Sequence, residues 1–143
     1  MTIWRPVLAV ALAVWFGALA GRAATQTSPA EPPWPIPANA AEERNPLAVT
    51  EAVLTAGLKV FSSKCIRCHG LQGLGDGPDA DGAHRTHMDL TAPDRAALNP
   101  DGVVFFKVWN GRSSPHMPRF ADELSREQAW AVVTYVQALR KPR

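Results

Sequence analysis

One run of five residues, Cys-Ile-Arg-Cys-His at positions 65–69, constrains this chain more than any other feature. Cys65 and Cys68 are the only cysteines among its 143 residues, and they lie three positions apart. On a helical turn this spacing places both thiols on one face, and His69 follows directly. Three chemistries use such a pair of cysteines: a redox dithiol, a zinc site, and covalent attachment of haem.

The surroundings of the run favour haem attachment. A thioredoxin-type dithiol follows a strand in an α/β pattern, whereas this run ends a helical pattern in a chain without strand periodicity. A structural zinc site usually takes four ligands from paired Cys and His motifs, and the chain has no second cysteine pair. In the Cys-x-x-Cys-His pattern, both thiols bond to the porphyrin and the histidine ligates the iron. We therefore predict one covalently bound haem c, held by Cys65, Cys68 and His69.

Residues 1–20 have the pattern of a secretory signal peptide. Arg5 precedes an apolar stretch over residues 7–20, and small residues follow it. The stretch has about 14 residues, fewer than the roughly 20 that a membrane-spanning helix needs. We therefore expect an exported, periplasmic protein with an approximate cleavage point near residue 20, and membrane association only if the signal stays uncleaved.

The rest of the chain divides into a linker and one domain. Residues 21–46 are rich in Pro and Ala and lack helical or strand periodicity, so we expect a linker with little fixed structure. Trp34 in this segment either packs loosely at the surface or docks on the domain or on a partner. Residues 47–143 are long enough for one compact haem domain. The chain has no run of basic residues of the kind that binds nucleic acid.

The periodicity of residues 47–143 indicates helices. Within residues 50–64, Leu54, Leu58 and Phe61 recur at spacings of four and three, which predicts an amphipathic helix. Gly57 lies beside this stripe, although a glycine inside a helix costs roughly 1 kcal/mol relative to alanine. It therefore either marks a close approach of another helix or is simply tolerated.

Two further helices have clear start signals. The second has Asn99 as its N-cap and Pro100 as its first residue. The third begins at Ser125, whose hydroxyl forms a capping-box pattern with Gln128. Residues 70–98 show no sustained period, so we expect a long loop with a short helix near its end. A loop of this length is reasonable where it wraps around a cofactor.

Over about residues 50–142 the sequence resembles the class I cytochromes c, the monohaem cytochrome c family. The matching features are Gly57-x-x-x-Phe61-x-x-x-Cys65, the attachment run with Gly70 after it, Gly75-Asp76-Gly77-Pro78, Met117-Pro118-x-Phe120, and a last helix with Trp130 and Tyr135. The resemblance implies the all-α, small cytochrome c fold, with three to four helices wrapped around one covalently attached haem. It also implies that the first and last helices cross, with Gly57 and Phe61 against residues 130–135.

The sixth ligand of the iron has five candidates: Met117, Met88, His84, His87 and His116. The resemblance favours Met117, which lies in a proline-rich loop that holds a weakly binding thioether in place. We interpret Met88 as a packing residue. His116 is the adjacent rival, and its ligation would lower the redox potential, because a thioether favours reduced iron more than an imidazole does.

Two contacts beyond the ligands follow as expectations. The second ring nitrogen of His69 needs a hydrogen-bond acceptor, usually a backbone carbonyl. The resemblance implies that Pro78 supplies it, and the alternative is that Pro78 only forms a turn. Trp109 and Arg112 either contact the haem propionates or are, respectively, a packing residue and a solvent-exposed one.

With His69 and Met117 on the iron, no position is open to a substrate, and outer-sphere electron transfer remains. We therefore predict an electron carrier rather than an enzyme. Its partners would be a dehydrogenase or respiratory complex as donor and an oxidase or reductase as acceptor. It would work as a free carrier or as the cytochrome subunit of an oxidoreductase complex. The alternative is a haem enzyme or gas sensor with an open sixth iron position.

Overall fold

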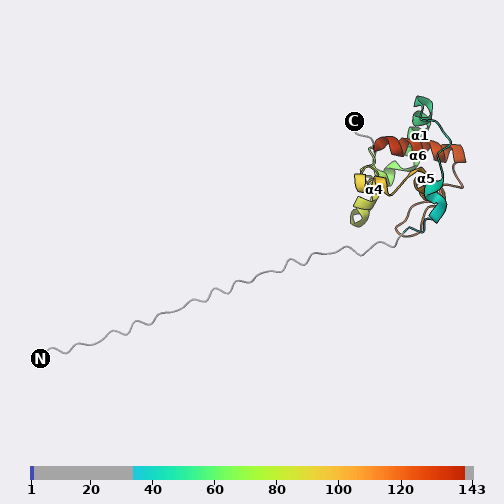
Figure 1. Cartoon of the computed structure of the whole chain (residues 1–143). Helices are drawn as coiled ribbons and strands as arrows, with labels where there is room; N and C mark the ends of the chain where they lie inside the picture. The colour runs from blue at the N-terminus through green and yellow to red at the C-terminus, as the bar shows by residue number, and fades with distance from the viewer. Residues whose placement is uncertain (2–33, 141–143) are drawn as a thin grey trace.

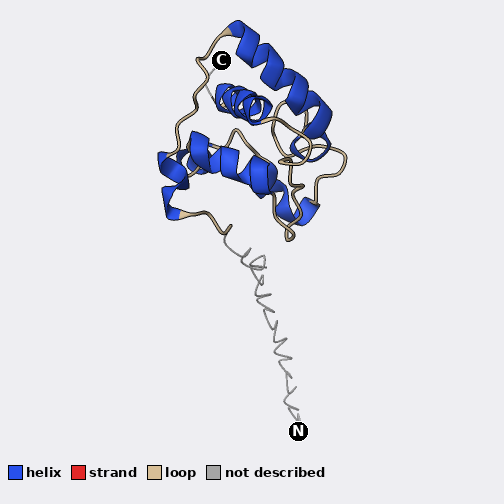
Figure 2. Cartoon of the chain, turned by 90° about the vertical axis from the view of Figure 1, so that its right-hand side faces the viewer, coloured by secondary structure: helices blue, strands red, loops and turns tan. Residues whose placement is uncertain are grey.

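The computed structural model describes Met1 and residues 34–140, and this part of the chain is helical (Figures 1 and 2). Its longer helices are α1 (Glu51–Lys64), α5 (Asp101–Asn110) and α6 (Arg126–Leu139). The shorter ones are η1 (Ala38–Glu42), α2 (Ile66–His69), η2 (Gly82–His84), α3 (Arg85–Met88) and α4 (Pro93–Ala97). Residues 34–140 contain no strand, which confirms the all-α prediction. The predicted signal peptide, residues 1–20, lies outside the described residues, as do residues 21–33 of the predicted linker.

Helices α1 and α6 pack against each other (Figure 1). The two helices approach most closely at Gly57. A Cβ atom at Gly57 would lie 2.2 Å from the carbonyl oxygen of Ala131 and 2.8 Å from the Cβ of Tyr135. Phe61 is fully buried, and its ring centroid lies 5.2 Å from that of Tyr135. Gly57 therefore marks the close helix approach, as the resemblance implied.

The buried face of α1 differs in one position from the predicted stripe. Leu58 is 41% exposed, whereas Gly57, Val60 and Phe61 are buried. The contact at Gly57 turns the residues three and four positions further along toward α6. Leu58 is only one position from Gly57, about 100° around the helix, and therefore faces away from the crossing.

Helix α5 begins one residue later than predicted. Its N-cap is Pro100, and its first residue is Asp101. Asn99 is buried before the helix, where its side-chain amide donates to the carbonyl of Arg95. The start signal was therefore correct to within one residue, and the predicted short helix near residues 94–98 is α4.

Helices α5 and α6 complete a common core. The ring of Phe105 stacks on that of Trp130, with centroids 4.1 Å apart. The core includes the buried residues Val60, Phe61, Val104, Phe105, Val108, Phe120, Leu124, Ala129, Trp130, Val132, Val133 and Val136. Within residues 34–140, no helix has both the length and the apolar character to cross a membrane.

The capping box at the start of α6 is confirmed. Ser125 Oγ accepts a hydrogen bond from the backbone N–H of Gln128 at 3.1 Å, and Gln128 Oε1 accepts from the backbone N–H of Ser125 at 2.8 Å. Two of the backbone donors at this helix start thus have side-chain partners.

Ser125→Ala is expected to lower the free energy of unfolding by about 1 kcal/mol, because it leaves one of these donors without its side-chain acceptor. Chemical denaturation followed by circular dichroism measures the loss. Gln128→Ala removes the reciprocal bond and serves as the comparison. A Ser125→Ala protein as stable as the parent would show that the box contributes nothing measurable.

Residues 34–46, part of the predicted linker, pack on the helical domain. The chain passes so close to α5 that a Cβ at Gly102 would lie 2.0 Å from the carbonyl oxygen of Ala40. The side-chain amide of Asn45 donates to Thr134 Oγ1 on α6 at 2.9 Å. The contacts at Gly102 and Asn45 each depend on a single residue. Hydrophobic periodicity does not detect such contacts, so the sequence predicted a linker with little fixed structure here.

Candidate cofactor site

Two adjoining cavities lie next to the Cys-Ile-Arg-Cys-His run, one of about 340 Å³ and one of about 80 Å³. The residues that line both are Trp34, Cys65, His69, His87, Arg112 and Met117. Because these side chains are common to both, the two cavities lie side by side and together form the candidate site. The structure thus brings together the thiol of Cys65, the imidazole of His69 and the thioether of Met117, which the sequence analysis assigned to one haem site.

The larger cavity combines an apolar wall with basic side chains. Its apolar lining includes Phe61, Leu90, Val104, Val108, Val132 and Val136. Its basic lining consists of Arg95, Lys107, Arg112 and Arg140. A flat hydrophobic ligand that carries carboxylates matches this lining, since the ring is removed from water while the acids meet cations. Haem, with two propionates on an apolar macrocycle, is such a ligand.

His69 is the last residue of α2, and its ring is fixed by one hydrogen bond. Its Nδ1 lies 2.7 Å from the carbonyl oxygen of Met88. A carbonyl only accepts, so Nδ1 carries the proton and the lone pair remains on Nε2. Burial lowers the pKa of His69, and the hydrogen bond to Met88 opposes this shift. The ring is therefore neutral at neutral pH and oriented as an iron ligand must be.

The prediction that Pro78 supplies this acceptor is wrong. Pro78 is exposed and is not among the residues that line either cavity. The segment around it is held against the outer side of α2, because Asp79 N–H donates to the carbonyl of Arg67 at 2.7 Å and the two side chains form an ion pair. Helix α3 instead ends next to His69 and presents the carbonyl of Met88.

Cys65 and Cys68 are free thiols in the structure, and both are partly buried. Burial raises the pKa of the Cys65 thiol to about 12, and the neighbouring Cys68 adds to the effect. Cys65 is therefore protonated at neutral pH.

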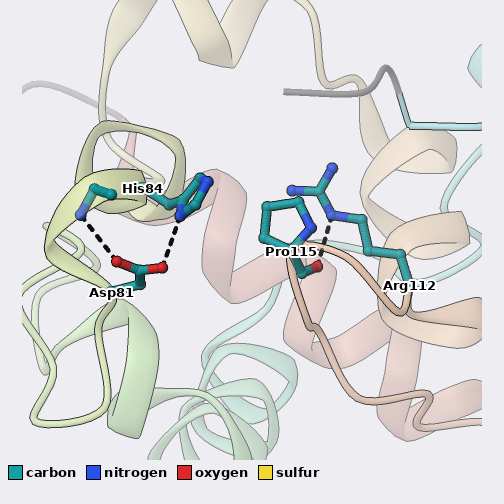
Figure 3. A network of polar contacts seen from close by, with 5 residues as sticks. Asp81, His84, Arg112 and Pro115 are labelled. Atoms are coloured by element: carbon teal, nitrogen blue, oxygen red, sulfur yellow. Dashed lines mark hydrogen bonds and ion pairs between the residues drawn. The ribbon is translucent and has the colours of Figure 1, made fainter. Parts of the chain in front are cut away.

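Met117 is positioned by a loop that is closed by its own backbone. Arg112 and Met117 exchange two backbone hydrogen bonds, each 2.9 Å long. Arg112 Nε also donates to the carbonyl of Pro115 at 3.0 Å, across the same loop (Figure 3). The thioether is thus held at the cavities by local contacts rather than by a long helix.

The rival ligands occupy different places. His116 is exposed, whereas Met117 is partly buried. His84 lines only the smaller cavity, and its Nδ1 donates to the carboxylate of Asp81 at 2.8 Å (Figure 3). This hydrogen bond lowers the pKa of Asp81. His87, another of the five candidates, lines both cavities.

Of the two residues considered as propionate contacts, the structure places only one at the cavities. Arg112 lines both cavities. Trp109 instead stacks on Phe105, with ring centroids 5.5 Å apart, and it is not among the lining residues. The other basic lining residues come from separate elements, α4, α5 and the end of α6, so no local sequence signal groups them.

The model of the cytochrome c family matches residues 54–140, which span α1 to α6. The chain belongs to the cytochrome c family. The family has haem c as its cofactor, and the helical structure is the all-α cytochrome c fold. The apolar wall and the basic side chains of the cavity fit that cofactor.

One curated cytochrome and two solved structures are similar to this chain. Cytochrome c550 of Pseudomonas aeruginosa is 29% identical over 103 residues, which cover 67% of this chain and 62% of the relative. The match therefore spans less than two thirds of that cytochrome. A chain in the reducing HAO-like protein complex of Kuenenia stuttgartiensis aligns with a TM-score of 0.52 and 29% identity, over 67% of this chain and 47% of that one. The c-type cytochrome KustC0563 aligns with a TM-score of 0.47 and 26% identity, over 59% of this chain and 98% of that one.

Proposed function

We propose that this member of the cytochrome c family is a monohaem electron carrier. Its haem is attached through Cys65 and Cys68, and its iron is ligated by His69 and Met117. The observation that carries the proposal is the common cavity lining of Cys65, His69 and Met117. When bound, haem supplies a reversible one-electron change at iron.

The chain's own residues would set the reduction potential of the iron. The hydrogen bond to the Met88 carbonyl keeps His69 in one tautomer and orientation. The buried valines of α5 and α6 exclude water, which disfavours the more highly charged ferric state and raises the potential. The thioether of Met117 acts in the same direction and fills the last position on the iron, so that no substrate binds there.

The proposed partners are other redox proteins. A dehydrogenase or respiratory complex would donate the electron, and an oxidase or reductase would accept it. The Kuenenia stuttgartiensis chain belongs to a reducing HAO-like complex, which supports a role as the cytochrome subunit of a larger oxidoreductase. A role as a free carrier is the alternative. The signal pattern of residues 1–20 supports export to the periplasm.

Met117→Ala tests the ligand assignment. The ferric parent protein is expected to show a sulfur-to-iron charge-transfer band at the red edge of its spectrum, and the variant is expected to lose it. Loss of the thioether should shift the reduction equilibrium toward ferric iron about a hundredfold, or about 120 mV for one electron. Absorption spectra and potentiometric titration measure both effects.

His116→Ala is the matched control, because it removes the adjacent rival from the same loop. It is expected to keep the band and the potential of the parent. A parent protein without this band, whose spectrum and potential change in His116→Ala but not in Met117→Ala, would assign the sixth position to His116. High-spin iron that readily binds carbon monoxide in the reduced parent would instead support the haem enzyme or gas sensor.

A further inference from the structure

Trp34 lies upstream of the region matched to the cytochrome c family, residues 54–140, yet it lines both cavities. Two cations contact its indole ring. The guanidinium carbon of Arg112 is 4.2 Å from the ring centroid, and Lys107 Nζ is 5.0 Å from it. Cation–π contacts of this geometry are attractive and favour a position of the ring beside the two cations. A residue outside the family domain therefore forms part of the cofactor site.

The segment that carries Trp34 is anchored at several points along its length. We call residues 34–46 the N-terminal strap. Beyond the contact at Gly102 and the bond from Asn45, Glu43 Oε1 pairs with Arg126 at the start of α6, 3.0 Å away. The strap thus follows a fixed path across α5 and α6, and its first described residue is Trp34.

The indole nitrogen of Trp34 points to a ligand. Trp34 Nε1 is buried, and residues 34–140 offer it no hydrogen-bond acceptor. An indole N–H only donates, and leaving such a donor buried without an acceptor is unfavourable. The acidic side chain that lines the larger cavity, Asp89, accepts bonds at Oδ1 from the N–H and the hydroxyl of Thr91 at 2.8 and 2.7 Å, and it accepts none from the indole.

The charge of the cavity indicates which acceptor fits. Arginine and lysine side chains surround the space beside Trp34, and the lining cations are Arg95, Lys107, Arg112 and Arg140. Such a setting favours an anionic oxygen over a neutral one. The cofactor of the family brings two carboxylates to this cavity.

We propose that the N-terminal strap closes the haem cavity and that the Trp34 indole N–H donates a hydrogen bond to a haem propionate. The inference rests on the bound haem of the proposed function and adds a residue from outside the family domain to its site. A donor to the carboxylate draws negative charge away from the iron, so it raises the potential. Trp34 is thus a positioning residue for the propionate and tunes the iron through it.

Trp34→Phe in the haem-loaded protein is the direct test, because phenylalanine keeps an aromatic ring beside the cations and removes the N–H. The reduction equilibrium is expected to shift toward ferric iron by about threefold to tenfold, where tenfold corresponds to about 59 mV. Potentiometric titration measures the shift, with circular dichroism to confirm the fold of the variant.

Glu43→Gln is the control for a merely structural effect. It removes the charge pair with Arg126 and so loosens the same strap without touching the indole. Its potential is expected to stay within twofold of the parent equilibrium. An equal shift in Glu43→Gln, or no shift in Trp34→Phe while haem is attached, would overturn the proposal. A parent protein without haem would instead contradict the proposed function itself.

A second measurement keeps the test open if Trp34→Phe fails to fold. In the reduced parent protein, the NMR signal of the Trp34 indole proton is expected to lie downfield and to exchange with solvent at least about tenfold more slowly than in an unfolded peptide. The Glu43→Gln protein should keep that signal. A rapidly exchanging indole proton would contradict the proposed hydrogen bond.

Discussion

The double variant Cys65→Ser, Cys68→Ser is expected to lose all covalently bound haem. Serine hydroxyls do not replace thiols in the thioether bonds, and His69 alone provides only a dissociable bond to the iron. Haem staining of a denaturing gel measures the result, because only covalently attached haem stays with the chain. The expected change is from full staining in the parent to none in the double variant.

The two single variants are the controls for this loss. Each keeps one cysteine and is expected to retain some staining, because one thioether is enough to hold haem to the denatured chain. Cys65 lines both cavities and Cys68 lines only the smaller one, so both thiols lie at the site. Staining that persists in the double variant would show that another residue forms the attachment.

Gly57→Ala is expected to destabilise the protein by about 2 kcal/mol, and Gly57→Val to prevent the native packing of α1 on α6. Alanine improves the helix by about 1 kcal/mol. Its Cβ, however, would lie 2.2 Å from the Ala131 carbonyl oxygen, and relieving such overpacking costs about 3 kcal/mol. The backbone cannot yield as a flexible side chain does, so the helices must separate. Thermal and chemical denaturation measure both variants.

Gly82→Ala is the matched control for the crossing. A Cβ at Gly82 meets no atom within 4 Å, and its backbone has no positive φ. The substitution is therefore expected to change the free energy of unfolding by less than about 0.5 kcal/mol. If Gly57→Ala were equally neutral, the close approach of the two helices would not limit stability.

Features that depend on neighbours in sequence were predictable. The spacing of Cys65 and Cys68 with His69 predicts a site because all three lie on one turn, and the structure brings two of them to both cavities. The capping box of Ser125 and Gln128 is equally local and is present. The iron ligation by Met117 stays a prediction, although the loop does place this residue at the site.

Features that depend on tertiary packing were not predictable in the same way. The acceptor for His69 is a backbone oxygen of Met88, and any residue supplies such an oxygen, so no side chain signals it. The path of α3 decides which carbonyl reaches the ring. Trp34 has no periodic neighbours, and its place at the cavity depends on the missing side chain of Gly102 and on the amide of Asn45.

The crossing of α1 and α6 also sets the order in which the chain can fold. Most helical domains fold quickly because their contacts are local in sequence, but here the main interface joins the first and the last long helix. The intervening chain must be closed into a loop before that interface forms, at a cost in entropy. Val132 and Val136 of α6 also form part of the cavity wall. The pocket beside the cysteines is therefore incomplete until the last helix has been synthesised and has docked.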